Sequence, residues 1–297
     1  MNCYLSFLIP TYNHVCVALS RELSEQITAA GIDAEVVVMD DGSSDASTVE
    51  QNRAISNIEH CTFIRNESNA GRATVCNKLA AVAHGRWLVF LDADVFPTTT
   101  NFVSEYASAT SQASIVGGGV RYRTDSTICP LRLMFGLHSE VSTAAERNKN
   151  PYKSFVTANV MMSAEVMQHV HFAEDIKQYG YEDLLMGKEL QNRGYTVMHI
   201  DNPVFHDDKD TSEQFLQKTR TSLHTLRAIS NKIGDKSRIN NAYMQLKTWH
   251  LLWAMRIFFR ATRKPFERNL LSQHPQILVF NLYKLGYYCE LSHGSLV

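Results

Sequence analysis

VVVMDDGSSD, residues 36–45, places four apolar residues directly before two adjacent carboxylates, Asp40 and Asp41. Three more apolar runs occur in the first hundred residues, with the sequences YLSFLIP, CTFIRN and RWLVFLDAD. The intervals between them are long enough for helices such as ALSRELSEQITAAG, which closes on Gly31. Unbroken apolar runs are typical of strands that helices cover on both faces. The sequence therefore predicts an α/β fold with a mostly parallel sheet.

Polar residues stand at the ends of three of these runs, in LIPTYN, VMDDGS and FLDADV. The ligand crevice of a parallel sheet lies beyond the carboxyl ends of its strands, so we expect these residues to converge. A buried carboxylate is costly unless a cation or a hydrogen-bond donor meets it. DDGSSD is also ordinary turn chemistry, in which an aspartate caps the next helix. At this stage Asp40 and Asp41 fit either a ligand site or a turn.

The composition favours a globular protein with a small-molecule partner. The chain has 297 residues, of which 44% are hydrophobic, so it can bury a sizeable core. A formal net charge of -1 does not favour nucleic acid, whose phosphates require a basic surface. The six cysteines form no C-x-x-C pair, so we expect neither a zinc ribbon nor a disulfide scaffold. The N-terminal residues lack a signal-peptide pattern, which leads us to expect a cytoplasmic protein.

LVFLDADVF places Asp92 and Asp94 two residues apart at the end of a predicted strand. If the extended geometry continues through Asp94, both carboxylates face one ligand. Two carboxylates, with phosphate oxygens as further ligands, suit Mg²⁺ or Mn²⁺ because these cations prefer oxygen. The alternative is a strand-end turn in which Asp94 is a helix cap.

Three later segments carry further candidates. NAGRATVCNKLA places Arg72 in a first helical turn, where it could bind an anion or lie at the surface. GYEDLLMGKEL places Glu182 and Asp183 in the first turn of another predicted helix. They either stabilise the start of that helix or supply a general base. A lone histidine is usually structural, but His206 in NPVFHDD becomes a candidate metal ligand because suitable carboxylates occur upstream.

The C-terminal part changes in character from about Tyr243. LKTWHLLWAMRIFFRATRKPFERNLL combines aromatic and aliphatic residues with six basic ones, and its first acidic residue is Glu267. As one helix, it would carry apolar residues nearly all the way round. No charge-free window approaches the ~18 residues that a bilayer span needs. Two interpretations stand, a helix on an anionic membrane surface or a helix packed on the domain or on a second subunit.

Six motifs together resemble a known family. IPTYNH, VVVMDDGSSD, NAGRATVCN, FLDADV, YEDLLMGKEL and VFH occur in the order and approximate spacing of family 2 glycosyltransferases with the GT-A fold. The resemblance covers about residues 3–210. It implies a Rossmann-like sheet flanked by helices in a nucleotide-sugar-binding and catalytic domain over residues 1–210. A helical C-terminal extension over 211–297, which could bind a membrane or a partner, would follow.

The resemblance also implies roles for single residues. Asp40 or Asp41, with Asp41 favoured, would accept a hydrogen bond from the uracil ring, and Asp183 would be the catalytic base, with Glu182 nearby for the acceptor or donor sugar. Asp94 and His206 would hold Mn²⁺ or Mg²⁺. Ten positions match the donor-binding motifs of the family: Pro10, Thr11, Asn13, Asp40, Asp41, Asn69, Gly71, Arg72, Asp92 and Asp94.

The implied reaction is an inverting, metal-dependent transfer of one hexosyl or N-acetylhexosaminyl group from a nucleotide-diphospho-sugar, with a UDP-sugar favoured. The acceptor would be a hydroxyl of a saccharide or of a lipid-linked molecule. The basic aromatic C-terminus, which lies outside the resemblance, suggests cell-surface polysaccharide assembly and peripheral contact at the cytoplasmic face of the membrane. The chain lacks the Q-x-x-R-W pattern of processive synthases, which favours single transfer. Two alternatives are a haloacid-dehalogenase-like phosphotransferase, whose nucleophile strand LVFLDADVF resembles, and a non-catalytic nucleotide-sugar-binding protein. The sugar, the acceptor and the oligomeric state do not follow from the sequence.

Overall fold

The computed structural model describes residues 4–124, 128–175, 180–234 and 237–291. The chain forms two compact units that interleave along the sequence. The first comprises Met1–Arg123, Ser142–Asp175 and Met186–Asp207, and the second comprises Thr124–Val141, Ile176–Leu185 and Asp208–Val297. The predicted catalytic domain ends at residue 210. Two short segments within it, Thr124–Val141 and Ile176–Leu185, belong to the same unit as the C-terminal helices.

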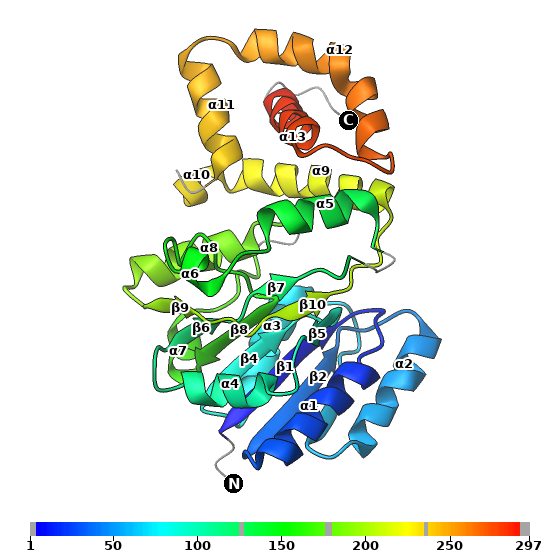
Figure 1. Cartoon of the computed structure of the whole chain (residues 1–297), viewed down its shortest axis with the longest axis vertical. Helices are drawn as coiled ribbons and strands as arrows, with labels where there is room; N and C mark the ends of the chain where they lie inside the picture. The colour runs from blue at the N-terminus through cyan, green and yellow to red at the C-terminus, as the bar shows by residue number, and fades with distance from the viewer. Residues whose placement is uncertain (1–3, 125–127, 176–179, 235–236, 292–297) are drawn as a thin grey trace. The chain divides into compact units, whose positions relative to one another are not determined.

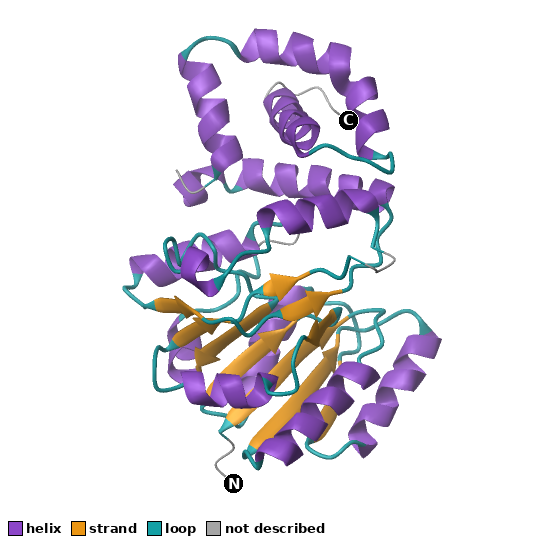
Figure 2. Ribbon diagram, viewed as in Figure 1, coloured by secondary structure: helices purple, strands orange, loops and turns teal. Residues whose placement is uncertain are grey.

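A seven-stranded sheet in the order β3-β2-β1-β4-β8-β6-β9 organises the first unit (Figure 2). Its strands are β1 (Leu5–Thr11), β2 (Ala34–Asp40), β3 (Cys61–Arg65), β4 (Trp87–Leu91), β6 (Ile115–Gly117), β8 (Asn159–Ser163) and β9 (Val197–His199). Neighbouring strands are parallel, except that β8 runs antiparallel to both β4 and β6. The predicted mostly parallel sheet is therefore confirmed.

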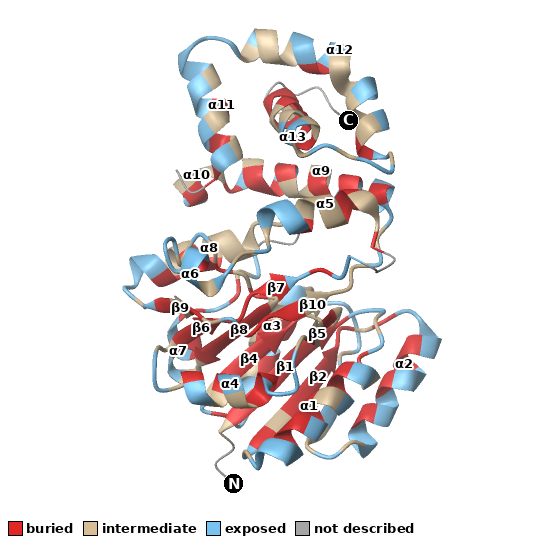
Figure 3. Cartoon of the chain, viewed as in Figure 1, coloured by how far each residue is buried: buried red, intermediate tan, exposed pale blue. Residues whose placement is uncertain are grey.

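Helices cover the sheet of the first unit on both faces (Figure 1). They are α1 (Val17–Ala30), α2 (Ala46–Arg53), α3 (Arg72–Val82), α4 (Phe102–Ala109), α6 (Ala144–Arg147) and α7 (Ala164–His169), with the 3-10 turn η1 (Ala54–Asn57). Helix α1 ends on Gly31, whose left-handed conformation suits glycine, as the pattern predicts. The central strands are buried along their length (Figure 3), which explains their unbroken apolar sequences.

The segment from Thr98 to Phe155 contributes short strands to two sheets of the first unit. It supplies β6 to the main sheet and β7 (Val120–Arg121) to a second sheet of order β5-β10-β7. The other two strands of that sheet are β5 (Val95–Pro97) and β10 (Val204–His206). Strands of two or three residues are too short to show a periodic pattern of their own.

The second unit is helical, as expected. It contains α5 (Pro130–Ser139), α9 (Ser212–Ala228), α10 (Ser230–Ile233), α11 (Arg238–Thr248), α12 (Leu252–Leu270) and α13 (Ile277–Leu291). Helix α8 (Glu182–Asn192) begins in this unit and continues into the first. The basic aromatic stretch is not one helix, because it breaks between α11 and α12, where His250 has a φ of 57°. Within the described ranges, every helix is too short or too polar to cross a membrane.

Helix α13 packs closely on α12 at a glycine. Phe259 of α12 is fully buried, with its ring centroid 5.4 Å from that of Tyr283. A Cβ atom on Gly286 would lie 2.4 Å from Cδ2 of Phe259. The absence of a side chain at Gly286 therefore lets the two helices approach.

We expect Gly286→Ala to lower the free energy of unfolding by about 1–3 kcal/mol through overpacking. Alanine would otherwise raise helix stability by about 1 kcal/mol, so the sign of the effect is diagnostic. Urea denaturation would measure the change. The double variant Gly286→Ala with Phe259→Leu should recover part of the loss, and a net stabilisation by Gly286→Ala alone would contradict the packing argument.

Candidate functional site

A pocket of about 420 Å³ lies in the first unit, where the segments after β1, β2 and β4 meet. Twelve residues line it: Pro10, Thr11, Tyr12, His14, Asp41, Asn69, Gly71, Arg72, Val75, Asp92, Ala93 and Asp94. Eight of the ten positions that match donor-binding motifs are among them. Tyr12 and His14 are lining residues that were not predicted, although both lie within the motif IPTYNH. The expected convergence at the carboxyl ends of the strands is confirmed.

The two remaining positions, Asn13 and Asp40, lie outside the lining and hold loops in place. Asp40 is fully buried, and its Oδ2 accepts a 3.0 Å hydrogen bond from Nε of Arg65. The backbone N–H of Ser43 donates to Oδ1 of Asp40 at 3.2 Å. Asn13 has a φ of 50°, and its Oδ1 accepts the N–H of Ser44 at 3.0 Å. The charge of Asp40 is thus met inside the protein.

Asp41 faces the pocket and shapes the segment opposite. Its Oδ1 accepts the N–H of Ala70 at 2.8 Å and Nδ2 of Asn66 at 3.2 Å. Its Oδ2 accepts the N–H of Gly71 at 2.8 Å, and the φ of Gly71, 91°, favours glycine. A carboxylate offers about four acceptor positions, of which these bonds occupy three. Oδ2 can therefore accept one more hydrogen bond from a ligand.

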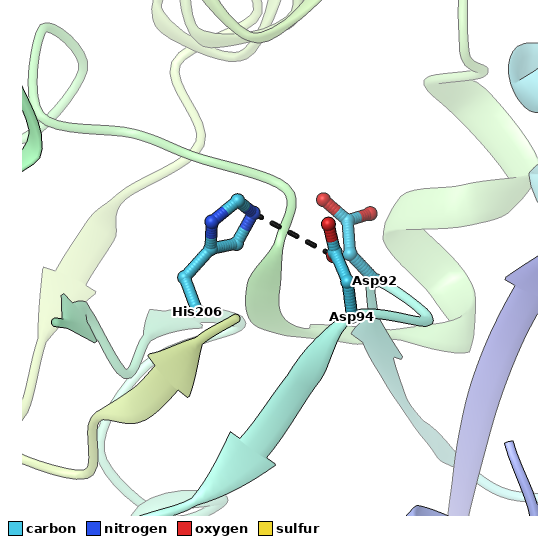
Figure 4. Close-up of side chains that lie close together, drawn as sticks. All are labelled: Asp92, Asp94 and His206. Carbon is cyan, nitrogen blue, oxygen red and sulfur yellow. Dashed lines mark ion pairs between the residues drawn. The ribbon is translucent and has the colours of Figure 1, made fainter. Parts of the chain in front are cut away.

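Asp92, Asp94 and His206 converge beside this pocket (Figure 4). One ligand atom from each lies within 4.8 Å of the others. The His206 Nε2 atom is 3.5 Å from Asp94 Oδ1, the ion pair drawn as a dashed line. The side chains of Asp92 and Asp94 are 26% and 32% exposed, so both can be reached by a ligand. Two carboxylates and an imidazole fit Mn²⁺ or Mg²⁺, with positions left for ligand oxygens.

A turn after β4 and the pairing of β10 with β5 bring these three side chains together. Strand β4 ends at Leu91, and Ala93 and Asp94 form a turn before β5. The chain therefore does not stay extended through Asp94. The strand-end turn that was the alternative is present, but a strand and not a helix follows it, and this turn places the two carboxylates together. Strand β10 pairs antiparallel with β5, which sets His206 opposite Val95.

Arg72 lies at the first position of α3 and reaches across the pocket. Its Nε donates to Oδ1 of Asp92 at 3.0 Å. The Arg72 side chain is 38% exposed. A guanidinium next to the amides of a helix N-terminus suits a phosphate group. Arg72 therefore lies where it could bind an anion, as predicted. In this structure its partner is the carboxylate of Asp92.

A buried polar network holds the segments that lead to β10. Asn159 Nδ2 donates to the carbonyls of Gly119 and Asn202 at 2.8 and 2.9 Å. Arg147 Nη2 donates to the carbonyl of Ile200 at 2.6 Å. Burial lowers the pKa of the Arg147 guanidinium. Asn159 and Arg147 were not predicted from the sequence, where the one signal for this network is the glycine run VGGG at 116–119.

Glu182 and Asp183 belong to the second unit, in the first turn of α8. The carboxylate of Glu182 accepts the N–H of Gly180 at 3.0 Å. Gly180 and Tyr181 have φ values of 107° and 69°, and a bulky residue such as Tyr181 is strained there. Strain of this kind concentrates at functional sites. Asp183 is half-buried.

A sequence model of the family described as Glycosyl transferase family 2 matches residues 6–166, just over half of the chain. The chain belongs to glycosyltransferase family 2. This glycosyltransferase is 37% identical over 92 residues to an "Uncharacterized glycosyltransferase" of Haemophilus influenzae. That match covers 30% of this chain and 29% of the relative, so the chain spans less than a third of the relative's length in the alignment. The matched region contains LVFLDADVF, so this segment no longer supports the phosphotransferase alternative.

Solved structures share the fold of this family 2 glycosyltransferase. S. aureus TarS 1-349 has a TM-score of 0.56 at 17% identity, over 98% of this chain and 91% of that one. The mannosyltransferase PcManGT from Pyrobaculum calidifontis, solved with GDP-Man and Mn²⁺, has a TM-score of 0.58 at 16% identity. The alignment with PcManGT covers 97% of this chain and 85% of that one. These similarities confirm the GT-A fold.

We expect Asp94→Asn and His206→Ala each to weaken Mn²⁺ binding by ~10-fold or more. Loss of a residue that only supports a metal ligand already costs about that much. Each substitution changes one of the three candidate ligands that the structure brings together. Electron paramagnetic resonance of free Mn²⁺ would measure the affinity. Asp45→Asn is the matched control, because Asp45 is an exposed helix cap outside the cluster. Wild-type affinity in Asp94→Asn would remove that residue from the metal site.

Proposed function

We propose that this glycosyltransferase moves one sugar from a nucleotide-diphospho-sugar to a hydroxyl of a saccharide or lipid-linked acceptor, with inversion at the anomeric carbon. The observation that carries the proposal is the pocket that joins Asp41 and Arg72 to the cluster of Asp92, Asp94 and His206. A structure of TarS in complex with UDP-GlcNAc, with a TM-score of 0.57 at 14% identity, is among the similar folds. A saccharide or lipid-linked acceptor of this kind would place the enzyme in cell-surface polysaccharide assembly.

We assign the nucleotide base to the side of the pocket near Asp41. The remaining acceptor position on Asp41 suits an imide N–H such as that of uracil, which favours a UDP-sugar. Tyr12 lines the same pocket and is 48% exposed, so its ring is available for stacking on a base. Pro10, Thr11 and Asn69 complete this side.

The diphosphate would lie between Arg72 and the three-residue cluster. Asp94 and His206 would hold Mn²⁺ or Mg²⁺, with Asp92 near the ribose. When bound, this cation supplies positive charge that stabilises the leaving diphosphate. Arg72 would exchange Asp92 for phosphate oxygens and add a second positive charge at the N-terminus of α3.

The acceptor hydroxyl would lose its proton to Asp183. In a single displacement, the acceptor oxygen forms a bond to the anomeric carbon as the bond to the diphosphate oxygen breaks, and no covalent intermediate forms. The strained turn at Gly180 and Tyr181 supports a functional role for the acidic pair that follows it. Glu182, whose carboxylate closes this turn, would position Asp183 and contact a sugar.

We expect one class of nucleotide-sugar to raise the thermal unfolding midpoint by several degrees in the presence of Mn²⁺. A ligand at about 100 times its dissociation constant adds about 2.7 kcal/mol of stability. The panel consists of UDP-, GDP-, dTDP- and CMP-sugars, each with and without Mn²⁺, and Asp94→Asn should lose the metal dependence. If no donor shifts the midpoint at millimolar concentration, the proposed donor site is wrong.

We expect Asp183→Asn to lower sugar transfer by about 10²–10⁴-fold, the usual contribution of a general base. Donor binding should persist, because the residues of the donor pocket are unchanged. Product formation over a panel of saccharide and lipid-linked acceptors measures the first effect, and the donor-induced thermal shift measures the second. Glu189→Gln, on the same helix, is the control. Near-normal transfer by Asp183→Asn would refute the assignment, whereas donor binding without any product in the wild type would favour a non-catalytic protein.

A further inference from the structure

Exposed large apolar side chains concentrate in the C-terminal helices. The described part of the chain has thirteen of them, and eight lie between residues 244 and 278: Met244, Trp249, Leu251, Trp253, Ile257, Phe258, Leu271 and Leu278. Trp249 and Trp253 are 65% and 63% exposed. Tryptophan is usually well buried, so two exposed tryptophans among other apolar side chains indicate an interaction surface.

Helix α12 has a buried face and an exposed face. This differs from the prediction for the whole stretch as one helix, which would be apolar nearly all the way round. Phe259 and Leu270 are buried in the core of the second unit. Figure 3 shows most of α12 as exposed or intermediate, in contrast to the buried strands of the sheet. Residues at spacings of four, seven and four fall on one side of a helix. This spacing gives α12 an outer row: Trp253, Ile257, Lys264 and Arg268.

Positive charge dominates the same region. Residues 244–270 contain six lysines and arginines and one acidic residue, Glu267. Glu267 is engaged by Arg220 at 2.7 Å and by Arg263 at 3.0 Å. Among the described residues, Lys264 and Arg268 have no ion-pair partner. The acidic group is therefore neutralised within the unit, and the outer row keeps its positive charge.

We propose that the outer row of α12, together with Trp249 in the turn before it, docks on the surface of an anionic phospholipid bilayer. Tryptophan is enriched at the membrane interface, and Lys and Arg nearby are attracted to anionic headgroups. A basic helix with an apolar part fits a position in the plane of that interface. A second copy of the chain is the competing occupant of this surface, and it gives a separate outcome in the test below. The inference does not depend on the proposed sugar transfer.

Vesicle flotation tests the charge component. We expect the chain to float with equimolar phosphatidylcholine and phosphatidylglycerol and not with phosphatidylcholine alone, and to be released as salt is raised. Lys264→Gln with Arg268→Gln should weaken partitioning by about ten-fold or more, since each basic residue contributes several-fold. Arg21→Gln with Lys149→Gln removes the same charge from exposed positions of the first unit and serves as the control. Equal binding to both vesicles, or equal loss in the control, would overturn the proposal.

A second pair of variants tests the apolar component. Trp253→Ser with Ile257→Ser should also weaken flotation about ten-fold or more, since insertion follows the buried apolar area. Val82→Ser, an exposed apolar position in the first unit, should leave flotation unchanged. Both substituted side chains are exposed, and the thermal unfolding midpoint verifies the fold. Tryptophan emission should shift to the blue on anionic vesicles, because two of the three tryptophans lie on this surface.

Two further outcomes would overturn the proposal. One is flotation that survives both sets of substitutions. The other is a concentration-dependent dimer that Trp253→Ser abolishes, in a chain that does not float. Donor-induced thermal shifts are measured without lipid, so failure of the membrane proposal and failure of the proposed function can be told apart.

Discussion

The pairing of β10 with β5 is the contact on which the candidate site depends. These strands are separated by more than a hundred residues, and the N–H of Asp207 donates to the carbonyl of Asp94 at 2.8 Å. This register places His206 beside Asp94, and a slip of one residue would turn the imidazole to the other face. The buried Asn159 and the backbone bonds of Arg147 hold the segments that lead into the pair. The cluster is thus preorganised by backbone hydrogen bonds.

The adjacent carboxylates Asp40 and Asp41 show how neighbouring residues acquire different tasks. Asp40 is buried against Arg65 and Ser43, so its charge stabilises the loop and is unavailable to a ligand. Asp41 is also well buried, but it lies on the pocket and keeps an acceptor position. Its bond to Gly71 orders the segment from which Arg72 projects. Loop order and ligand recognition are therefore coupled through one carboxylate.

The second unit combines a tightly packed interior with a surface of a different kind. Gly286 permits close contact with Phe259, and aromatic rings fill the space between α12 and α13. Phe259, on the inner face of α12, is buried in this core, whereas Trp253 and Ile257 are exposed on the outer face. The same helix therefore serves the fold with one side and is available for a partner with the other.

Short windows of the sequence are enough to predict several features of this protein. Apolar runs predicted β1, β2, β3 and β4, Gly31 predicted the end of α1, and the ordered motifs placed eight of ten donor-binding positions in one pocket. The folded chain sets the turn at Asp94 and the division of the basic aromatic stretch into two helices. It also places Asp41, the carboxylate that the resemblance favours, on the pocket and buries Asp40. It also decided the position of His206. The reason is physical: propensity and periodicity are local, whereas burial, pairing register and helix faces depend on segments that meet only in the folded chain.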